Sequence, residues 1–180
     1  PTFVLHWSNA FEDGAEVVLD GFFQPNPTAR GIDRSANTDP RFKGFETLDM
    51  NVLQARAHRW RFNLVTGETK EESMSDQCSE FPMINGQHWG RPYRYSYNAR
   101  CAQGLFAFDG LIKHDVVAGT EELWEAPEGT FLSETVVAPK LGSTAEDDAY
   151  LLTFSSDIHN DMSHCEIFEA SDPASGPIAR

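Results

Sequence analysis

A histidine at the end of an apolar segment is the first residue in this sequence that could carry chemistry. His6 follows Phe3 and Leu5, and the acidic turn Glu12-Asp13-Gly14 comes shortly after it. A neutral imidazole can bind a transition metal through one ring nitrogen while the other nitrogen donates a hydrogen bond. The pattern therefore allows two interpretations of His6: a metal ligand at the end of a strand, or a hydrogen-bonded structural histidine.

A second group of metal-binding side chains lies closer to the end of the chain. The segment from Asp157 to His164 contains two carboxylates and two imidazoles, which are groups that can bind zinc. However, His159 and His164 are separated by a spacing that fits neither one face of a helix nor one face of a strand. We therefore interpret this segment as the polar tip of a hairpin rather than as a metal site.

The other histidines and the paired acids match no motif. We expect three of these histidines to lie at the surface or in hydrogen bonds: His58, His88 and His114. Three acidic pairs could suggest a glycosidase: Glu71-Glu72, Glu121-Glu122 and Asp147-Asp148. Because adjacent residues on a strand point to opposite faces, we interpret these pairs as solvated charge.

Four segments of the chain together resemble the carotenoid cleavage oxygenase family, which includes apocarotenoid, lignostilbene and retinoid-forming members. The first segment reads His6-x-x-Asn9-Ala10-x-Glu12-x-Gly14. The other three follow in the order and at the spacing of the family: Arg59 to Leu64 with Thr66-Gly67, Ser79 to Asn85, and Phe131 to Pro139. Four motifs in the right order are more specific than any one of them, and they span nearly all of the chain.

The resemblance implies a non-heme iron dioxygenase. Family members hold one Fe(II) with four histidines and use molecular oxygen to cleave a carbon–carbon double bond of an apolar conjugated alkene, giving two carbonyl products. His6 matches the third of these ligands in chain order, so the other three would lie outside this chain. Glu80 and Glu134 match the family's glutamates that orient the histidines. Glu80 would pair with His6, and Glu134 with a histidine beyond Arg180.

The same resemblance implies how the chain relates to a complete enzyme. Residues 1–180 would be a C-terminal-half fragment of one carotenoid oxygenase propeller domain, incomplete at both ends and inactive alone. No catalytic residue beyond the metal site is expected. The alternative is a non-catalytic β-propeller binding module without bound iron, and the iron content of the complete protein distinguishes the two.

The elements that would position these residues are predicted to be β-strands. Turn residues at Glu12-Asp13-Gly14 predict a hairpin. Alternation of polar and apolar residues predicts further strands over 59–64, 69–74, 91–100, 105–108, 111–116, 121–126, 131–138, 149–155 and 165–170. Asp109-Gly110 is predicted as a turn. Tyr93, Tyr95 and Tyr97 recur at period 2, which predicts three rings on one face of a strand.

Short strands separated by turns predict an all-β sandwich, barrel or propeller. The family resemblance selects a seven-bladed β-propeller, of which this chain would form about three to four blades of antiparallel strands at about 40 to 45 residues per blade. The proline-rich segment Gly21 to Gly44 is predicted to be one long loop. Glu46 to Leu53 is predicted to form one or two helical turns.

Composition narrows the partners of the protein. The chain has 14 Lys plus Arg against 28 Asp plus Glu, a net charge of −14, which disfavours binding to nucleic acid. No apolar segment is long enough for a transmembrane helix. The three cysteines, Cys78, Cys101 and Cys165, are an odd number without a C-x-x-C pair. We therefore expect reduced thiols, mostly buried as small apolar side chains, in a cytoplasmic protein.

Overall fold

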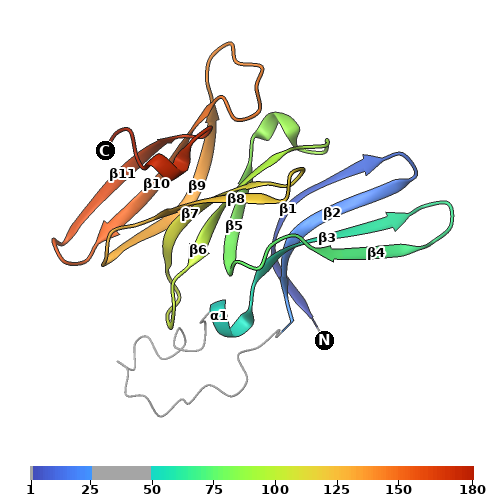
Figure 1. Cartoon of the computed structure of the whole chain (residues 1–180), viewed down its shortest axis with the longest axis horizontal. Helices are drawn as coiled ribbons and strands as arrows, with labels where there is room; N and C mark the ends of the chain where they lie inside the picture. Colours follow the sequence, from blue (N-terminus) through green and yellow to red (C-terminus); the bar gives the residue numbers. More distant parts are fainter. Residues whose placement is uncertain (1, 26–49) are drawn as a thin grey trace.

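The computed structural model describes residues 2–25 and 50–180, and it is built mainly of antiparallel strands (Figure 1). The first sheet contains β1 (Phe3–Asp13), β2 (Glu16–Gln24), β3 (Arg56–Asn63) and β4 (Thr69–Ser73). The middle sheet contains β5 (Ser79–Ile84), β6 (Tyr95–Cys101), β7 (Phe108–Asp115) and β8 (Thr120–Glu125). The last sheet contains β9 (Thr130–Pro139), β10 (Ala149–Asp157) and β11 (Met162–Glu169). The short helical elements are α1 (Met50–Leu53), η1 (Gly86–His88) and η2 (Pro173–Ser175).

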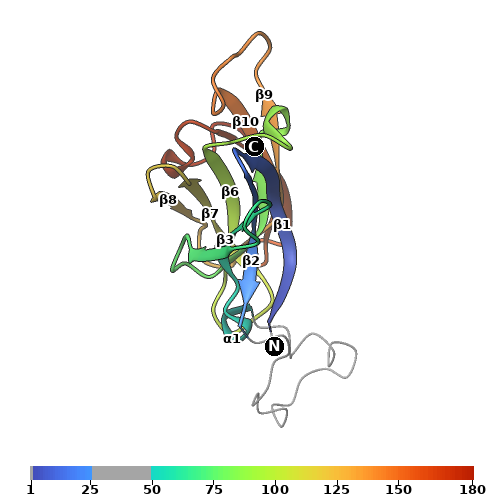
Figure 2. The ribbon, with the colours of Figure 1, turned by 90° about the vertical axis from the view of Figure 1, so that its right-hand side faces the viewer.

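Each sheet is a meander, because every strand pairs with the next strand of its sheet along the chain. Figure 1 shows the first and last sheets on opposite sides of the middle sheet, and Figure 2 views the molecule from the side of the first sheet. β1 contacts β5, and β5 contacts β9. The first strand of each sheet therefore lies next to the first strand of the neighbouring sheet.

Two apolar clusters hold the sheets together. The larger one lies between the middle and last sheets and includes the fully buried side chains of Tyr97, Leu111, Leu151 and Phe168. The smaller one joins the first sheet to the middle sheet: Phe11, Val18, Ile84 and Tyr93. Burial of each large apolar side chain stabilises the fold by roughly 1.5–3 kcal/mol. Within the described residues, no helix is both long enough and apolar enough to cross a membrane.

The structure confirms the all-β prediction and most of the strands. The first hairpin turns at Gly14, whose φ of 61° suits glycine. The strands predicted over 59–64, 69–74, 121–126, 131–138, 149–155 and 165–170 correspond to β3, β4, β8, β9, β10 and β11. Their ends differ by a few residues, because sequence patterns place the middle of a strand better than its ends.

The predicted turn at Asp109-Gly110 is wrong, because both residues lie inside β7. A Cβ on Gly110 would come within 2.7 Å of the Trp124 carbonyl oxygen on β8, so this glycine permits close packing of two backbones rather than a turn. Asp109 forms an ion pair of 2.8 Å with Arg100 on the neighbouring strand β6. In this Asp-Gly pair, the aspartate therefore binds a neighbouring strand and the glycine allows two strands to pack closely.

The predicted loop begins too early, because β2 continues through Gln24. Phe22 is buried in this part of the strand. A Cβ on Gly21 would lie 2.6 Å from the Trp7 ring, so the glycine makes room for that ring. The rest of the predicted loop, 26–44, lies outside the described residues. Of the predicted helical turns, α1 covers Met50–Leu53, and 46–49 are again outside the described residues.

The three tyrosines do not share one face of a strand, contrary to the sequence prediction. Tyr93 precedes β6, and its hydroxyl donates a hydrogen bond of 2.7 Å to Asp20 in the first sheet. The hydroxyl of Tyr97 instead donates to the Ala170 carbonyl, 3.1 Å away after β11. The period-2 pattern holds only from Tyr95 onward, where the ladder of β6 begins.

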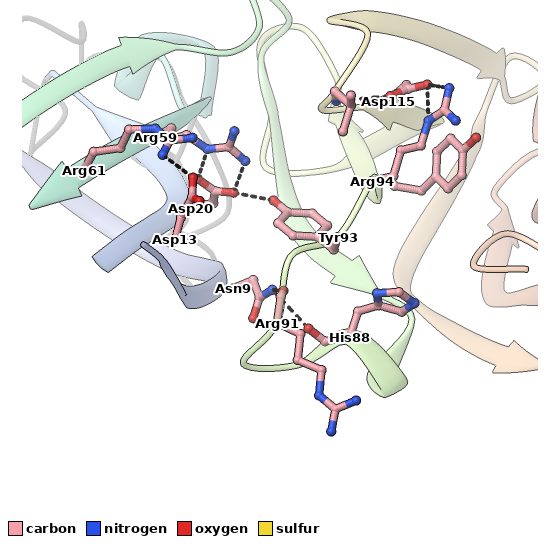
Figure 3. A network of polar contacts seen from close by, with 12 residues as sticks. Asn9, Asp13, Asp20, Arg59, Arg61, His88, Arg91, Tyr93, Arg94 and Asp115 are labelled. Carbon is pink, nitrogen blue, oxygen red and sulfur yellow. Dashed lines mark hydrogen bonds and ion pairs between the residues drawn. The ribbon is translucent and has the colours of Figure 1, made fainter. Parts of the chain in front are cut away.

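A buried polar group fixes the first sheet to the middle sheet. Asp20 is buried, and it accepts two hydrogen bonds of 2.7 Å from Arg59 and one from the Tyr93 hydroxyl (Figure 3). This bidentate pair raises the pKa of Arg59. Burial and the neighbouring Asp20 carboxylate raise the pKa of Tyr93 well above its usual value. The phenol is therefore held protonated as a hydrogen-bond donor.

Tyr93→Phe should lower the free energy of unfolding by roughly 1.5–3 kcal/mol near neutral pH, because a buried carboxylate loses a donor. The folded-state pKa of Tyr93 lies above that of the unfolded chain. Stability of the unsubstituted protein should therefore fall as the pH rises above about 10, and the variant should lack that part of the fall. Urea unfolding at several pH values measures both effects. Tyr150→Phe, at a partly exposed ring, is the matched control, and equal stability of the two variants would contradict the prediction.

Candidate metal-ligand site

His6 on β1 and Glu80 on β5 meet where the first and middle sheets come together. The Nδ1 atom of His6 lies 2.7 Å from the Oε2 atom of Glu80, which confirms the contact predicted from sequence. The His6 side chain is 39% exposed, whereas that of Glu80 is fully buried. The His6 ring also packs against Phe81, with ring centroids 4.7 Å apart. No hydrogen bond from the described residues reaches Nε2 of His6, so this nitrogen is available to a ligand.

The Glu80 carboxylate is held in place from two sides. Its Oε2 atom accepts from the Phe81 backbone N–H at 2.8 Å as well as facing Nδ1 of His6. Burial raises the pKa of Glu80, while the hydrogen bonds from Phe81 and His6 oppose the rise. Its Oε1 atom is buried and has no partner among the described residues. A carboxylate acceptor at Nδ1 selects the tautomer that leaves the Nε2 lone pair free.

Irregular pairing of the strands positions all three residues predicted for the site. His6 lies in the register shift of β1 between Val4 and Trp7. Glu80 borders the shift that ends at Met83, and the adjacent Phe81 has a φ of 52°. Glu134 lies in the part of β9 where the register to β10 changes. Such bulges re-aim side chains and are common beside functional sites. Sequence patterns gave no sign of them.

Glu134 lies apart from the His6–Glu80 pair. Its side chain is exposed on β9, and no described residue forms a hydrogen bond or ion pair with its carboxylate. β9 contacts β5, so the three predicted site residues lie on the adjacent first strands of the three sheets. The structure thus brings His6 and Glu80 together and leaves Glu134 without a partner in the described part of the chain.

Asn9, the second residue of the His6 motif, anchors β1 to the segment between β5 and β6. Its side-chain amide donates to the backbone carbonyls of His88 at 3.2 Å and Arg91 at 2.9 Å (Figure 3). Its side-chain oxygen accepts from the Gly90 N–H at 3.0 Å. The asparagine therefore holds in place the strand that carries His6, a role that the sequence did not reveal.

The other histidines take structural positions. His58 contacts Glu71 at 3.2 Å, and His88 contacts the Pro92 carbonyl at 3.1 Å, as expected for hydrogen-bonded histidines. His114 was expected in a similar position, but it is buried and its Nδ1 atom has no hydrogen-bond partner among the described residues. Burial lowers the pKa of His114. β6 and β8 enclose His114 on either side, where Ser96 and Glu121 are its register partners. Its Nδ1 atom lies 4.0 Å from a Glu121 carboxylate oxygen.

The segment Asp157 to His164 forms the turn and strand ends of the β10–β11 hairpin, as predicted. Across residues 2–25 and 50–180, no group of three or more histidine, cysteine or acidic side chains could hold a metal ion. Imidazole is a suitable ligand for iron. His6 suits one ligand position, because its Nε2 atom is free and its Nδ1 atom faces the Glu80 carboxylate. The described residues do not provide a complete ligand set.

A family comparison matches the whole chain. Residues 1–180 match the family described as "Retinal pigment epithelial membrane protein". The chain is 34% identical to the apocarotenoid-15,15'-oxygenase of Synechocystis sp. over 98% of its own length and 35% of that relative. It is 24% identical to lignostilbene-alpha,beta-dioxygenase isozyme III of Sphingomonas paucimobilis, over 99% of its own length and 38% of that relative. The chain thus spans about a third of the length of these relatives.

A solved structure shares the arrangement of the three sheets. The crystal structure of cobalt-substituted Synechocystis ACO superposes with a TM-score of 0.82 at 28% identity. The match covers 98% of this chain and 36% of that one. That relative is a cobalt-substituted protein, and its fold agrees with the family matched by the sequence.

Proposed function

The chain belongs to the retinal pigment epithelial membrane protein family, and from this premise we propose that it is part of a non-heme Fe(II) dioxygenase. The substrate class is a carotenoid, apocarotenoid or stilbene-type alkene, cleaved with molecular oxygen into two carbonyl products. The names of the relatives support this class, because they describe apocarotenoid, carotenoid and lignostilbene oxygenases. By "the whole protein" we mean the longer protein that would carry this chain.

The contact between His6 and Glu80 carries the proposal. His6 would bind iron through Nε2, while Glu80 holds Nδ1 and increases the basicity of the ring. Glu134 would orient a further ligand histidine outside this chain, which agrees with the absence of a partner among the described residues. Bound Fe(II) would supply the dioxygen chemistry, and the protein would supply ligand geometry and a site shielded from water.

Exposed apolar side chains support a larger assembly of sheets. Trp7 in the first sheet is 53% exposed, and Phe154 in the last sheet is 65% exposed. Phe3 and Val136 are also exposed on these two sheets. Exposed apolar patches on a folded protein usually mark a surface that packs against another part of the protein or against a partner. We propose that residues 1–180 form three blades of a seven-bladed propeller domain, with further sheets of the whole protein covering both faces.

Iron analysis and alkene cleavage test the proposed function together. The whole protein, purified and loaded with Fe(II), should hold one iron and convert an apocarotenoid or a lignostilbene into two carbonyl products, which chromatography detects. The 180-residue chain alone should neither retain stoichiometric iron nor cleave either alkene, because it offers one ligand of the set. A whole protein without iron or cleavage would favour a non-catalytic binding module. Cleavage by the isolated chain would contradict the assignment of ligands outside it.

A further inference from the structure

Two cysteines that are distant in sequence lie opposite each other across β5 and β6. Ser79 pairs with Arg100 and Glu80 with Ala99, so the next position of the same register opposes Cys78 and Cys101. The Cys101 N–H donates to the Cys78 carbonyl at 3.0 Å, which confirms this pairing. Hydrogen-bonded partners on antiparallel strands have Cα atoms about 5.5 Å apart. Disulfides span Cα distances of about 4.4–6.8 Å, so the separation typical of such strand partners lies within the range that a bridge can span.

The two sulfur atoms are also neighbours. The thiol of Cys101 takes part in a hydrogen bond with the Cys78 side chain, and this bond together with burial raises the pKa of Cys101. No disulfide is present, and Cys101 is buried whereas Cys78 is partly exposed. An oxidant from solvent therefore reaches Cys78 first, and Cys101 is placed behind it as a protonated thiol.

We propose that Cys78 and Cys101 form an oxidation site that closes to a disulfide when the protein meets a peroxide. The Cys78 thiolate attacks one peroxide oxygen, the O–O bond breaks, and a sulfenic acid forms with release of hydroxide. The Cys101 sulfur then attacks the Cys78 sulfur, the S–O bond breaks, and the departing oxygen leaves as water with the thiol proton. In total two thiols and one hydrogen peroxide give one disulfide and two waters, with two electrons passing from sulfur to oxygen.

The location of the pair gives the bridge a structural consequence. Cys78 lies two residues before Glu80, and side chains two positions apart point to the same side of an extended chain. The bridge would tie the start of β5 to the end of β6, next to the strand that positions Glu80. Cys165 lies on β11, so it provides an internal comparison. Formation of the bridge does not require bound iron.

Peptide mapping of the whole protein tests this site directly, because trypsin separates the three cysteines. Cleavage after Lys70, Arg94, Arg100, Lys113 and Lys140 places Cys78 in 71–94, Cys101 in 101–113 and Cys165 in 141–180. After hydrogen peroxide treatment and alkylation without reductant, mass spectrometry should show 71–94 joined to 101–113. Most of the separately alkylated 101–113 peptide should be lost. Dithiothreitol should restore both separate peptides. Peptide 141–180 should be recovered with Cys165 alkylated throughout, which shows that this cysteine remained a free thiol.

Two variants make the result decisive. Cys165→Ser should form the same link, whereas Cys101→Ser should leave Cys78 as a sulfenic acid that dimedone traps. A link of Cys78 to any other cysteine would overturn the proposal. So would oxidation of Cys78 to sulfinic acid, without a link, in the unsubstituted protein. The circular dichroism spectra before and after oxidation should agree. A link that forms only when the fold is lost would also overturn the proposal.

Discussion

Replacing His6 by alanine in the whole protein should abolish alkene cleavage and reduce iron occupancy below one per protein. His6 presents a free Nε2 while Glu80 holds the opposite ring nitrogen, and alanine offers no ligand atom. Packing should change less, because the His6 side chain is 39% exposed. The cost in stability should be about 1–3 kcal/mol, since the buried Glu80 loses one hydrogen-bond donor. Product formation, metal analysis and urea unfolding measure the three effects.

His159→Ala is the matched control, because this histidine is exposed in the turn between β10 and β11. It should keep full iron occupancy and normal turnover. Normal turnover in His6→Ala would contradict the assignment of His6 as an iron ligand. Loss of activity in both variants would point to general damage to the fold rather than to a ligand.

Strand pairing could be predicted from the sequence where a local pattern, such as a hairpin turn between two alternating segments, determines it. Alternating residues and the turn around Gly14 predicted the first hairpin, because the alternation of apolar and polar residues shows which face of a strand is buried. Gly21 and Gly110 were misread as a loop and a turn. Each instead lies inside a strand where another chain segment approaches closely. Such contacts come from tertiary packing, which a local pattern does not contain.

The candidate site could be predicted only as far as the family motifs reached. They correctly placed His6 beside Glu80 across a long separation in sequence. Composition alone could not reveal that Cys78 and Cys101 oppose each other, because the register between β5 and β6 decides it. The buried position of His114 was likewise invisible, since its neighbours in sequence are charged. Register and packing between sheets therefore account for most of what was missed.

Glu80→Gln in the whole protein should lower iron affinity or cleavage activity by roughly 10- to 100-fold. The amide oxygen of glutamine can still accept from His6 and from the Phe81 N–H, so the ring keeps its orientation. The amide nitrogen of glutamine would take the place of Oε1, an atom that already lacks a partner among the described residues. The substitution would therefore remove mainly the negative charge that, under the proposed function, makes the His6 ring a stronger ligand. Iron titration and turnover measurements give the effect.

A double-mutant cycle separates this positioning role from a simple structural one. If Glu80 acts through His6, Glu80→Gln should lower iron affinity in the unsubstituted protein but have little further effect in the His6→Ala background. Glu68→Gln, at an exposed glutamate just before β4, should leave affinity and turnover unchanged in either background. A purely structural glutamate would instead give the same loss of iron affinity with or without His6. A change in activity of less than about threefold for Glu80→Gln would show that the carboxylate does not tune the ligand, because outer carboxylates of this kind usually contribute at least about tenfold.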